Sequence, residues 1–389
     1  MGGIGALSDI FEEYMESDGP SDSLRVRSTL QRVRSLFAPY MSESIKVSES
    51  DSSGLGMFST KYITRGELIL IDHPIVSVPD VDLALSPYNE HDGGDSLCLT
   101  DVISSNFSPS VEKCLRTLYP IRSNCSLVKT SSVPPELVDR LRCHLPDNIS
   151  PGHLIAAVQL NSLGYYTFPE LVTYDDHLRF LSGTGIYPQG SMFNHSCHPN
   201  INHYAVGDVT FFRATHDIPA GEELFISYIG RDLLVESKSI RDEFLNARDF
   251  KCACSKCKDV DDGPDPWLEE LGIQERAKLR LLKSREERVL YIEQILKSHD
   301  YISRDVFELK FAMARDSGLT GLAIWNELIS STNGCLDMQS IVLRMHFLRN
   351  FGQNDTVEAE LVETGRLVLG DDMGSFDFLQ SLFRITDFK

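Results

Sequence analysis

Cys252, Cys254 and Cys257 place three thiols within six residues of this 389-residue chain. Thiolates are soft ligands, and zinc prefers four ligands in a tetrahedron, with each sulfur about 2.3 Å from the metal. The spacing therefore predicts a zinc site that still lacks one ligand. Incidental cysteines and a redox cluster are the alternative interpretations.

The fourth ligand is predicted to come from the run Asn-His-Ser-Cys-His-Pro-Asn at residues 194–200. Cys197 is the favoured ligand, and His198 and His203 are the alternatives. Four thiolates would leave no coordination position for a substrate, so the site is expected to be structural. It would tie the 194–200 run to the three-cysteine segment, and loss of the metal should loosen any pocket that the two share.

Asn194 and His195, at the start of the same run, could hold a small ligand. An asparagine side chain both donates and accepts hydrogen bonds, which suits a zwitterionic amino-acid group. An ordinary loop with satisfied polar residues is the alternative interpretation. About thirty residues later, Gly-Glu-Glu-Leu at 221–224 leads to Tyr228. The two glutamates there are expected to serve structure or surface charge rather than proton transfer.

Short strands separated by glycine turns are the elements that must position these residues. Turns are predicted at Gly54-Leu55-Gly56 and at 63–67, and short strands are expected again over 179–228. The other predicted strands lie at 45–47, at 57–58 and at 68–71. This pattern favours small β-sheets over a βαβ array.

Helices are predicted around this β region from apolar spacing and from prolines at their first turns. The expected helical segments are 24–40, 109–119, 135–143, 151–170 and 231–249. Prolines and serines elsewhere in 80–150, with Asp92-Gly93-Gly94-Asp95, indicate loops within an insertion. After a proline-rich acidic linker at 259–266 the pattern is helical to the end. These later stretches include 303–316, 335–351 and 355–368.

The composition excludes several classes of protein. Hydrophobic residues make up 42% and charged residues 24% of the chain, as in soluble globular proteins. No apolar run approaches 18 residues, so no membrane span is expected. The formal net charge of −20 disfavours direct nucleic-acid binding and favours basic protein partners, unless it serves solubility alone. An odd number of cysteines, nine, and the lack of a secretory signal indicate the cytoplasm or the nucleus.

In this order and spacing, the motifs resemble the core of SET-domain protein-lysine methyltransferases, closest to the SMYD subfamily and its MYND-less fungal relatives. The matching features are Gly54-Leu55-Gly56, Asn161, Gly183-Thr184-Gly185-Ile186-Tyr187-Pro188, the 194–200 run, 221–224 with Tyr228, and the three-cysteine tail. The resemblance implies an α+β fold, the SET-domain β-clip of small sheets with a pseudoknot. The implied organisation is an N-terminal helical segment (1–43), a SET domain split into 44–79 and 151–230, a helical insertion (80–150), a post-SET zinc segment (231–260) and a C-terminal helical domain (261–389).

The same resemblance implies an S-adenosylmethionine-dependent protein-lysine N-methyltransferase that acts on a histone or another basic protein. Tyr228 would be the active-site tyrosine, and Phe250 would stack on the adenine of the donor. The implied donor-binding residues are Gly54, Leu55, Gly56, Asn161, Asn194, His195, Tyr228 and Phe250. The implied ligands of one structural zinc ion are Cys197, Cys252, Cys254 and Cys257.

The chain departs from the SMYD pattern at three points. Residues 80–150 lack the cysteine pattern of a MYND zinc finger. Leu163 stands where an aromatic channel residue is common, and Arg248 stands where a tyrosine is common. Leu163 and Arg248 favour the alternative of a catalytically weak or inactive SET-fold zinc-binding protein, whose C-terminal helical domain would bind protein partners.

Overall fold

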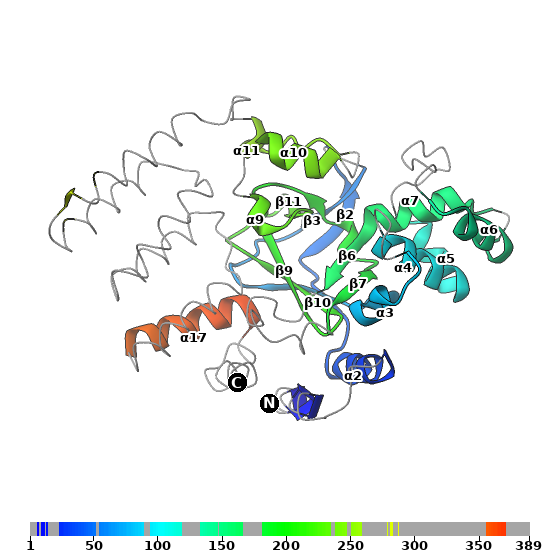
Figure 1. Ribbon diagram of the computed structural model, residues 1–389. Coiled ribbons are helices and arrows are strands. Elements are labelled where there is room, and N and C mark those ends of the chain that lie inside the picture. Colours follow the sequence, from blue (N-terminus) through cyan, green and yellow to red (C-terminus); the bar gives the residue numbers. More distant parts are fainter. Residues whose placement is uncertain are drawn as a thin grey trace.

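Three small sheets and a set of surrounding helices make up the part of the chain that the structure describes (Figure 1). The structure is a computed structural model. The described residues are 6–7, 9–11, 13–14, 23–51, 54–88, 94–118, 133–146, 148–165, 181–234, 238–246, 250–258, 278, 281–282, 287 and 355–370. Within these ranges, no helix combines the length and the apolarity that a membrane crossing requires.

Two four-stranded sheets carry the segments that form the site. The first has the order β1 (Tyr40–Met41), β4 (Leu68–Asp72), β10 (Val209–Ala214) and β9 (Ile201–Val206). The second has the order β2 (Ile45–Glu49), β3 (Leu55–Ser59), β11 (Glu223–Ile226) and β8 (Asn194–His195). The β8–β11 pair is parallel, whereas the other pairs in these sheets are antiparallel. Segments far apart in sequence therefore become neighbours in the second sheet.

The third sheet joins the predicted insertion to the site. Its order is β5 (Val76–Pro79), β7 (Gly183–Ile186) and β6 (Ser162–Tyr165). The helices beside it are α3 (Asp80–Ala84), α4 (Gly94–Ser105), α5 (Pro109–Leu115), α6 (Pro135–His144) and α7 (Pro151–Asn161). They gather on one side of the sheets in Figure 1 and share an apolar core with β5 and β7. Proline opens α5 and α6, as the sequence predicts, and it also opens α7.

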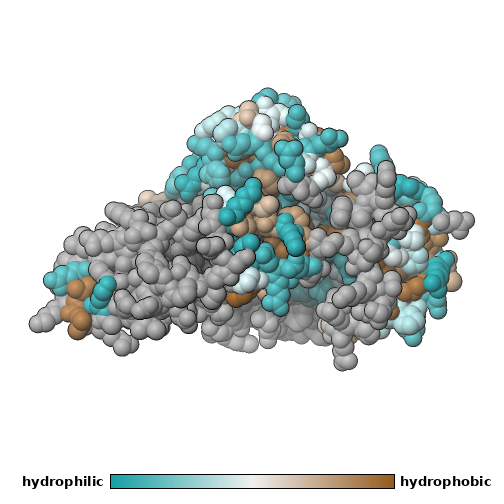
Figure 2. Space-filling model, turned by 90° about the horizontal axis from the view of Figure 1, so that it is seen from above, coloured by the Kyte–Doolittle hydropathy of each residue, from teal (hydrophilic) through white to brown (hydrophobic). Residues whose placement is uncertain are grey.

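The remaining described helices lie around the sheets. They are α2 (Ser23–Leu36), η2 (Gly190–Met192), α9 (Arg231–Leu234), α10 (Lys238–Asn246), α11 (Ser255–Lys258) and α17 (Asp355–Leu369). The described surface seen in Figure 2 mixes hydrophilic and hydrophobic side chains. Of the later helical predictions, α17 matches 355–368, whereas 303–316 and 335–351 lie outside the described residues.

Two predictions about local structure are wrong. The helix predicted over 151–170 ends at Asn161, and β6 follows it at once and pairs with β7. Residues 154–158 are buried on every side, so their apolar pattern does not mark where a helix gives way to a strand. Residues 94–105, placed in a loop region, form α4, because Leu97, Leu99 and Ile103 are buried in the insertion core.

Candidate functional site

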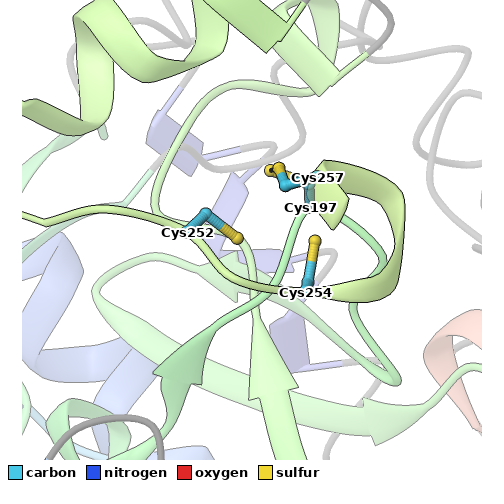
Figure 3. Close-up of side chains that lie close together, drawn as sticks. All are labelled: Cys197, Cys252, Cys254 and Cys257. Atoms are coloured by element: carbon cyan, nitrogen blue, oxygen red, sulfur yellow. Dashed lines mark hydrogen bonds between the residues drawn. The ribbon is translucent and has the colours of Figure 1, made fainter. Parts of the chain in front are cut away.

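The four predicted sulfur ligands converge. The Sγ atoms of Cys197, Cys252, Cys254 and Cys257 all lie within 4.8 Å of one another, and their side chains turn toward a common space in Figure 3. The sulfurs of Cys257 and Cys197 are 3.6 Å apart. A tetrahedron with zinc–sulfur bonds of about 2.3 Å places its sulfurs roughly 3.8 Å apart. The donor set and its spacing therefore fit one zinc ion.

The two alternative histidines do not belong to this cluster. His203 lies in β9 and stacks on Phe212, with ring centroids 5.6 Å apart, and burial lowers its pKa to about 4. His198 is exposed. Among the described residues, the potential metal-binding group at this position consists of the four cysteines alone.

Two cationic side chains lie buried beside the sulfurs, and the sequence analysis missed both. Arg241 in α10 is 2% exposed, and its Nη2 donates to Cys257 Sγ over 3.5 Å. Lys256 is 8% exposed and donates to the carbonyl of Leu234. Burial lowers the pKa of Lys256 to about 8, while the neighbouring thiolates oppose that shift. Four thiolates around Zn²⁺ carry a net negative charge, which these cations offset.

The glycine turn, β8 and β11 meet at one polar cluster. Asn194 lies opposite Phe225 in the parallel β8–β11 pair. Its Nδ2 donates to the Leu55 carbonyl over 3.1 Å and to Glu223 Oε1 over 2.7 Å. The other carboxylate oxygen of Glu223 accepts from Ser50 over 2.9 Å. Glu223 therefore fixes the amide of Asn194, a structural role of the kind predicted for the acidic pair.

Glycine is required at the centre of this cluster. A Cβ added to Gly56 would lie 2.3 Å from Glu223 Oε1 and 2.9 Å from Asn194 Nδ2. Gly54 has φ of +56°, which disfavours larger residues, yet the described residues place no atom within 4 Å of the position of its Cβ. The turn thus combines close packing on one side with open space on the other. A small zwitterionic ligand could approach the backbone there.

Three rings join this polar cluster to the cysteines. The ring centroids of His195 and Tyr228 are 5.3 Å apart, those of His195 and Phe250 are 5.7 Å apart, and those of Tyr228 and Phe250 are 6.1 Å apart. The Tyr228 hydroxyl donates to the carbonyl of Phe193 over 2.8 Å. Tyr228 and Phe250 also pack against the apolar cluster that contains the buried cysteines. The sequence-distant segments therefore converge as predicted.

Asn161 and Leu163 lie on the insertion side of the site. The Nδ2 of Asn161 donates to Ala157 within its own helix over 2.8 Å, and its main-chain carbonyl accepts from Ser191 over 3.3 Å. Leu163 packs with Met192 and Tyr228 on the core cluster that contains Phe193. Leu163 and Tyr228 thus share one apolar cluster. Arg248 lies outside the described residues.

Two further polar residues hold the site together and were not singled out from the sequence. Asn200 donates to the Glu223 carbonyl over 2.8 Å and accepts from the Phe225 amide over 2.7 Å, so it clamps β11. Asp72 accepts from the amides of Gln189 and Gly190 over 2.9 and 2.7 Å. Burial raises the pKa of Asp72 to about 6. Asn200 could have been found from its place in the 194–200 run.

Comparison with known proteins agrees with this geometry. Residues 54–229 match the family model of the SET domain. N-lysine methyltransferase SMYD2-A of Xenopus laevis is 35% identical over 114 residues, which are 29% of this chain and 24% of that protein. Histone-lysine N-methyltransferase ASHR2 of Arabidopsis thaliana is 31% identical over 121 residues, 29% of this chain and 30% of that protein. Histone-lysine N-methyltransferase SMYD3 of Homo sapiens is 39% identical over 83 residues, 21% of this chain and 19% of that protein.

The matched stretch spans less than a third of each of these relatives. Among solved structures, Rubisco LSMT bound to sinefungin and monomethyllysine is 15% identical, with 91% of this chain and 96% of that chain covered and a TM-score of 0.29. A score this low supports no conclusion about shared detail. The family match over residues 54–229 confirms the predicted SET domain and the predicted α+β class, and the relatives show that this stretch is similar to SMYD proteins.

Proposed function

We propose that this chain, whose residues 54–229 form a SET domain, is an S-adenosylmethionine-dependent protein-lysine N-methyltransferase. The observation that carries the proposal is the convergence of Tyr228, His195 and Phe250, with ring centroids no more than 6.1 Å apart, beside the cysteine cluster. The relatives named as lysine methyltransferases support the same activity.

The donor site would be built from the glycine turn, Asn194, His195 and Phe250. Gly54 leaves open space at the turn, and Asn194 is held beside it by Leu55. The two Nδ2 protons of Asn194 are given to Leu55 and Glu223, so its Oδ1 is the atom that would accept from the ammonium group of a zwitterion. Phe250 offers a flat apolar face suited to an adenine ring. When bound, S-adenosylmethionine supplies a methyl group on a sulfonium that a neutral amine can attack.

The acceptor side requires a lysine in its neutral form. With a reference pKa of about 10.4, deprotonation costs roughly 4–5 kcal/mol at pH 7. Apolar walls penalise the ammonium form and lower that cost. Leu163 and Met192 pack on the same core cluster as Tyr228 and would supply such a wall. The Tyr228 hydroxyl and the Phe193 carbonyl, 2.8 Å apart, would orient the amine without acting as a general base.

The cysteine cluster would hold zinc as a structural element. The four protein sulfurs would fill all four coordination positions of the zinc ion, so none remains for a substrate. The metal would fix the segment that carries Phe250 against the loop that carries Cys197. Zinc removal would therefore loosen one wall of the donor site.

The substrate is proposed to be a histone or another basic protein, because the chain carries a formal net charge of −20. Two of the relatives are named histone-lysine methyltransferases, which supports a histone as the first substrate to test. Opposite charge would speed the encounter with such a substrate. A location in the cytoplasm or the nucleus stays a prediction. The five domain boundaries given above also stay predictions.

The test is donor binding followed by methyl transfer. Zinc-loaded protein is titrated with S-adenosylmethionine in a calorimeter and then incubated with radiolabelled donor and core histones. Saturable donor binding and label on lysine would support the proposal. No donor binding would overturn it. Donor binding without transfer to histones or to a mixture of other basic proteins would favour a weak or inactive SET-fold interaction protein, the alternative to which the aliphatic Leu163 points.

A further inference from the structure

We infer that His195 is a positioning residue that joins the cysteine cluster to Tyr228. One ring nitrogen, Nδ1, lies 2.9 Å from the backbone nitrogen of Tyr228. The other, Nε2, lies 3.3 Å from Cys197 Sγ. The ring is 4% exposed. The inference rests on the proposed function for its effect on methyl transfer, but its geometric part can be tested without it.

The chemistry of the two contacts fixes the tautomer. The Tyr228 amide can only donate, so Nδ1 of His195 must present its lone pair. A neutral ring then carries its proton on Nε2, which points at Cys197. A zinc-bound thiolate is a good acceptor for that proton, and outer hydrogen bonds of this kind orient ligands and tune the metal. The contact with Tyr228 therefore places the ring proton on Nε2, and the contact with Cys197 favours a proton at the same nitrogen.

The surroundings hold the ring in this orientation. His195 pairs in parallel register with Ile226, two residues before Tyr228, and the amide of Ser196 donates to the Ile226 carbonyl over 3.0 Å. Phe250 meets the imidazole edge-on, with an interplanar angle of 85°. Strand pairing on one side and a ring on the other restrict rotation of the imidazole.

The consequence concerns the position of the tyrosine. Tyr228 lies two residues after the end of β11, and its hydroxyl donates to the carbonyl of Phe193, which precedes β8. His195 thus holds the backbone of Tyr228, and the Phe193 carbonyl holds its side chain. A shift of Cys197 on loss of zinc would reach the Tyr228 backbone through a single imidazole.

Two conservative substitutions separate the two contacts. His195→Asn places an oxygen near the position of Nδ1, so it keeps an acceptor for Tyr228 and loses the donor to Cys197. His195→Gln places an amide nitrogen near the position of Nε2, so it keeps that donor and loses the acceptor. The same changes at the exposed His144 in α6 serve as controls.

The measurements are zinc release to a colorimetric chelator, donor affinity, and kcat and KM with core histones. His195→Asn should release zinc about 10-fold faster and lose less of its kcat than His195→Gln does. His195→Gln should retain zinc and lose about 10-fold in kcat, with a smaller loss in donor affinity than in kcat. The His144 variants should match the wild type. Equal effects of both His195 variants on zinc and on kcat would overturn the inference, since they would indicate a purely structural role.

A spectroscopic readout remains decisive if the protein transfers no methyl group or if a variant does not fold. In ¹⁵N-tyrosine protein, the Tyr228 amide signal is identified by its loss in Tyr228→Phe, and chelation of zinc should move it. With ¹¹³Cd in place of zinc, wild-type protein should show coupling between the metal and an imidazole N–H proton across the hydrogen bond to Cys197. An unmoved Tyr228 amide, or a His195 proton on Nδ1, would overturn the inference while leaving the proposed function intact. Absence of donor binding would overturn the proposed function alone.

Discussion

Replacement of Gly56 by alanine places a methyl group where the Glu223 carboxylate lies. The added Cβ would be 2.3 Å from Glu223 Oε1, about 1 Å shorter than an ordinary contact. The obstructing atoms end two side chains, that of Glu223, which is flexible and partly exposed, and that of the buried Asn194, whose Nδ2 would lie 2.9 Å away. Glu223 would swing away and give up its 2.7 Å bond from Asn194 and its 2.9 Å bond from Ser50.

The expected loss follows from those bonds. A hydrogen bond to a charged group contributes about 1.5–3 kcal/mol, and partial solvation of the freed carboxylate returns some of it. We expect the free energy of unfolding to fall by about 1–2 kcal/mol. Donor affinity should fall about tenfold, equivalent to about 1.4 kcal/mol, because Asn194 loses the partner that orients its amide.

Calorimetric titration with S-adenosylmethionine and urea unfolding measure the two quantities. Gly152→Ala is the matched control, because Gly152 lies in the first turn of α7 and no atom lies within 4 Å of the position of its Cβ. It should leave donor affinity unchanged and unfolding within about 1 kcal/mol. If Gly56→Ala loses stability but binds the donor as the wild type does, the polar cluster at the turn is structural and the donor site lies elsewhere.

Four further predictions test other parts of the site. Tyr228→Phe should lower kcat and leave donor affinity within about threefold; equal losses in both would make Tyr228 a binding or folding element. Cys254→Ser should release zinc and weaken donor binding together, as metal analysis and calorimetry would show, and an unchanged metal content would contradict the coupling. Arg241→Met should speed zinc loss to a chelator by about 10-fold, since it removes a buried cation beside Cys257, whereas Lys258→Met, an exposed control next to the same cysteine, should not. Burial raises the pKa of Asp72 from 3.8 to about 6. Between these two pH values the folded state keeps the proton that the unfolded state has lost, so the ionised carboxylate destabilises the folded state as the pH rises through this range. The unfolding free energy of the wild type relative to Asp72→Asn should therefore rise by about 1–3 kcal/mol as pH falls from about 7 to 4, and a flat difference would contradict the burial argument.

The metal cluster was the part of the site most open to prediction. Three cysteines in six residues limit the chemistry to very few choices, and zinc then demands one more ligand. Cys197 was predicted because it lies in a polar run of its own, and the structure places its sulfur 3.6 Å from that of Cys257. Local composition and ligand chemistry were sufficient here.

The partners of the site residues were not predictable, because they depend on strand pairing. Glu223 reaches Asn194 only because β8 and β11 lie side by side, a pairing that no local pattern specifies. Arg241 is one charged residue in a polar helix segment, and nothing in its neighbours indicates that it is buried. The end of α7 at Asn161 was missed for a related reason, since burial on all sides removes the periodic signal.

Cys197 and Cys257 lie 60 residues apart in the chain. At synthesis rates of about 5–20 residues per second, the ribosome needs roughly 3–12 s to make the stretch between them. During that time Cys197 is present without the full set of three other ligands. Zinc can be bound by all four sulfurs only after Cys257 has been made, so the wall that carries Phe250 is completed after the strands that precede it in the chain.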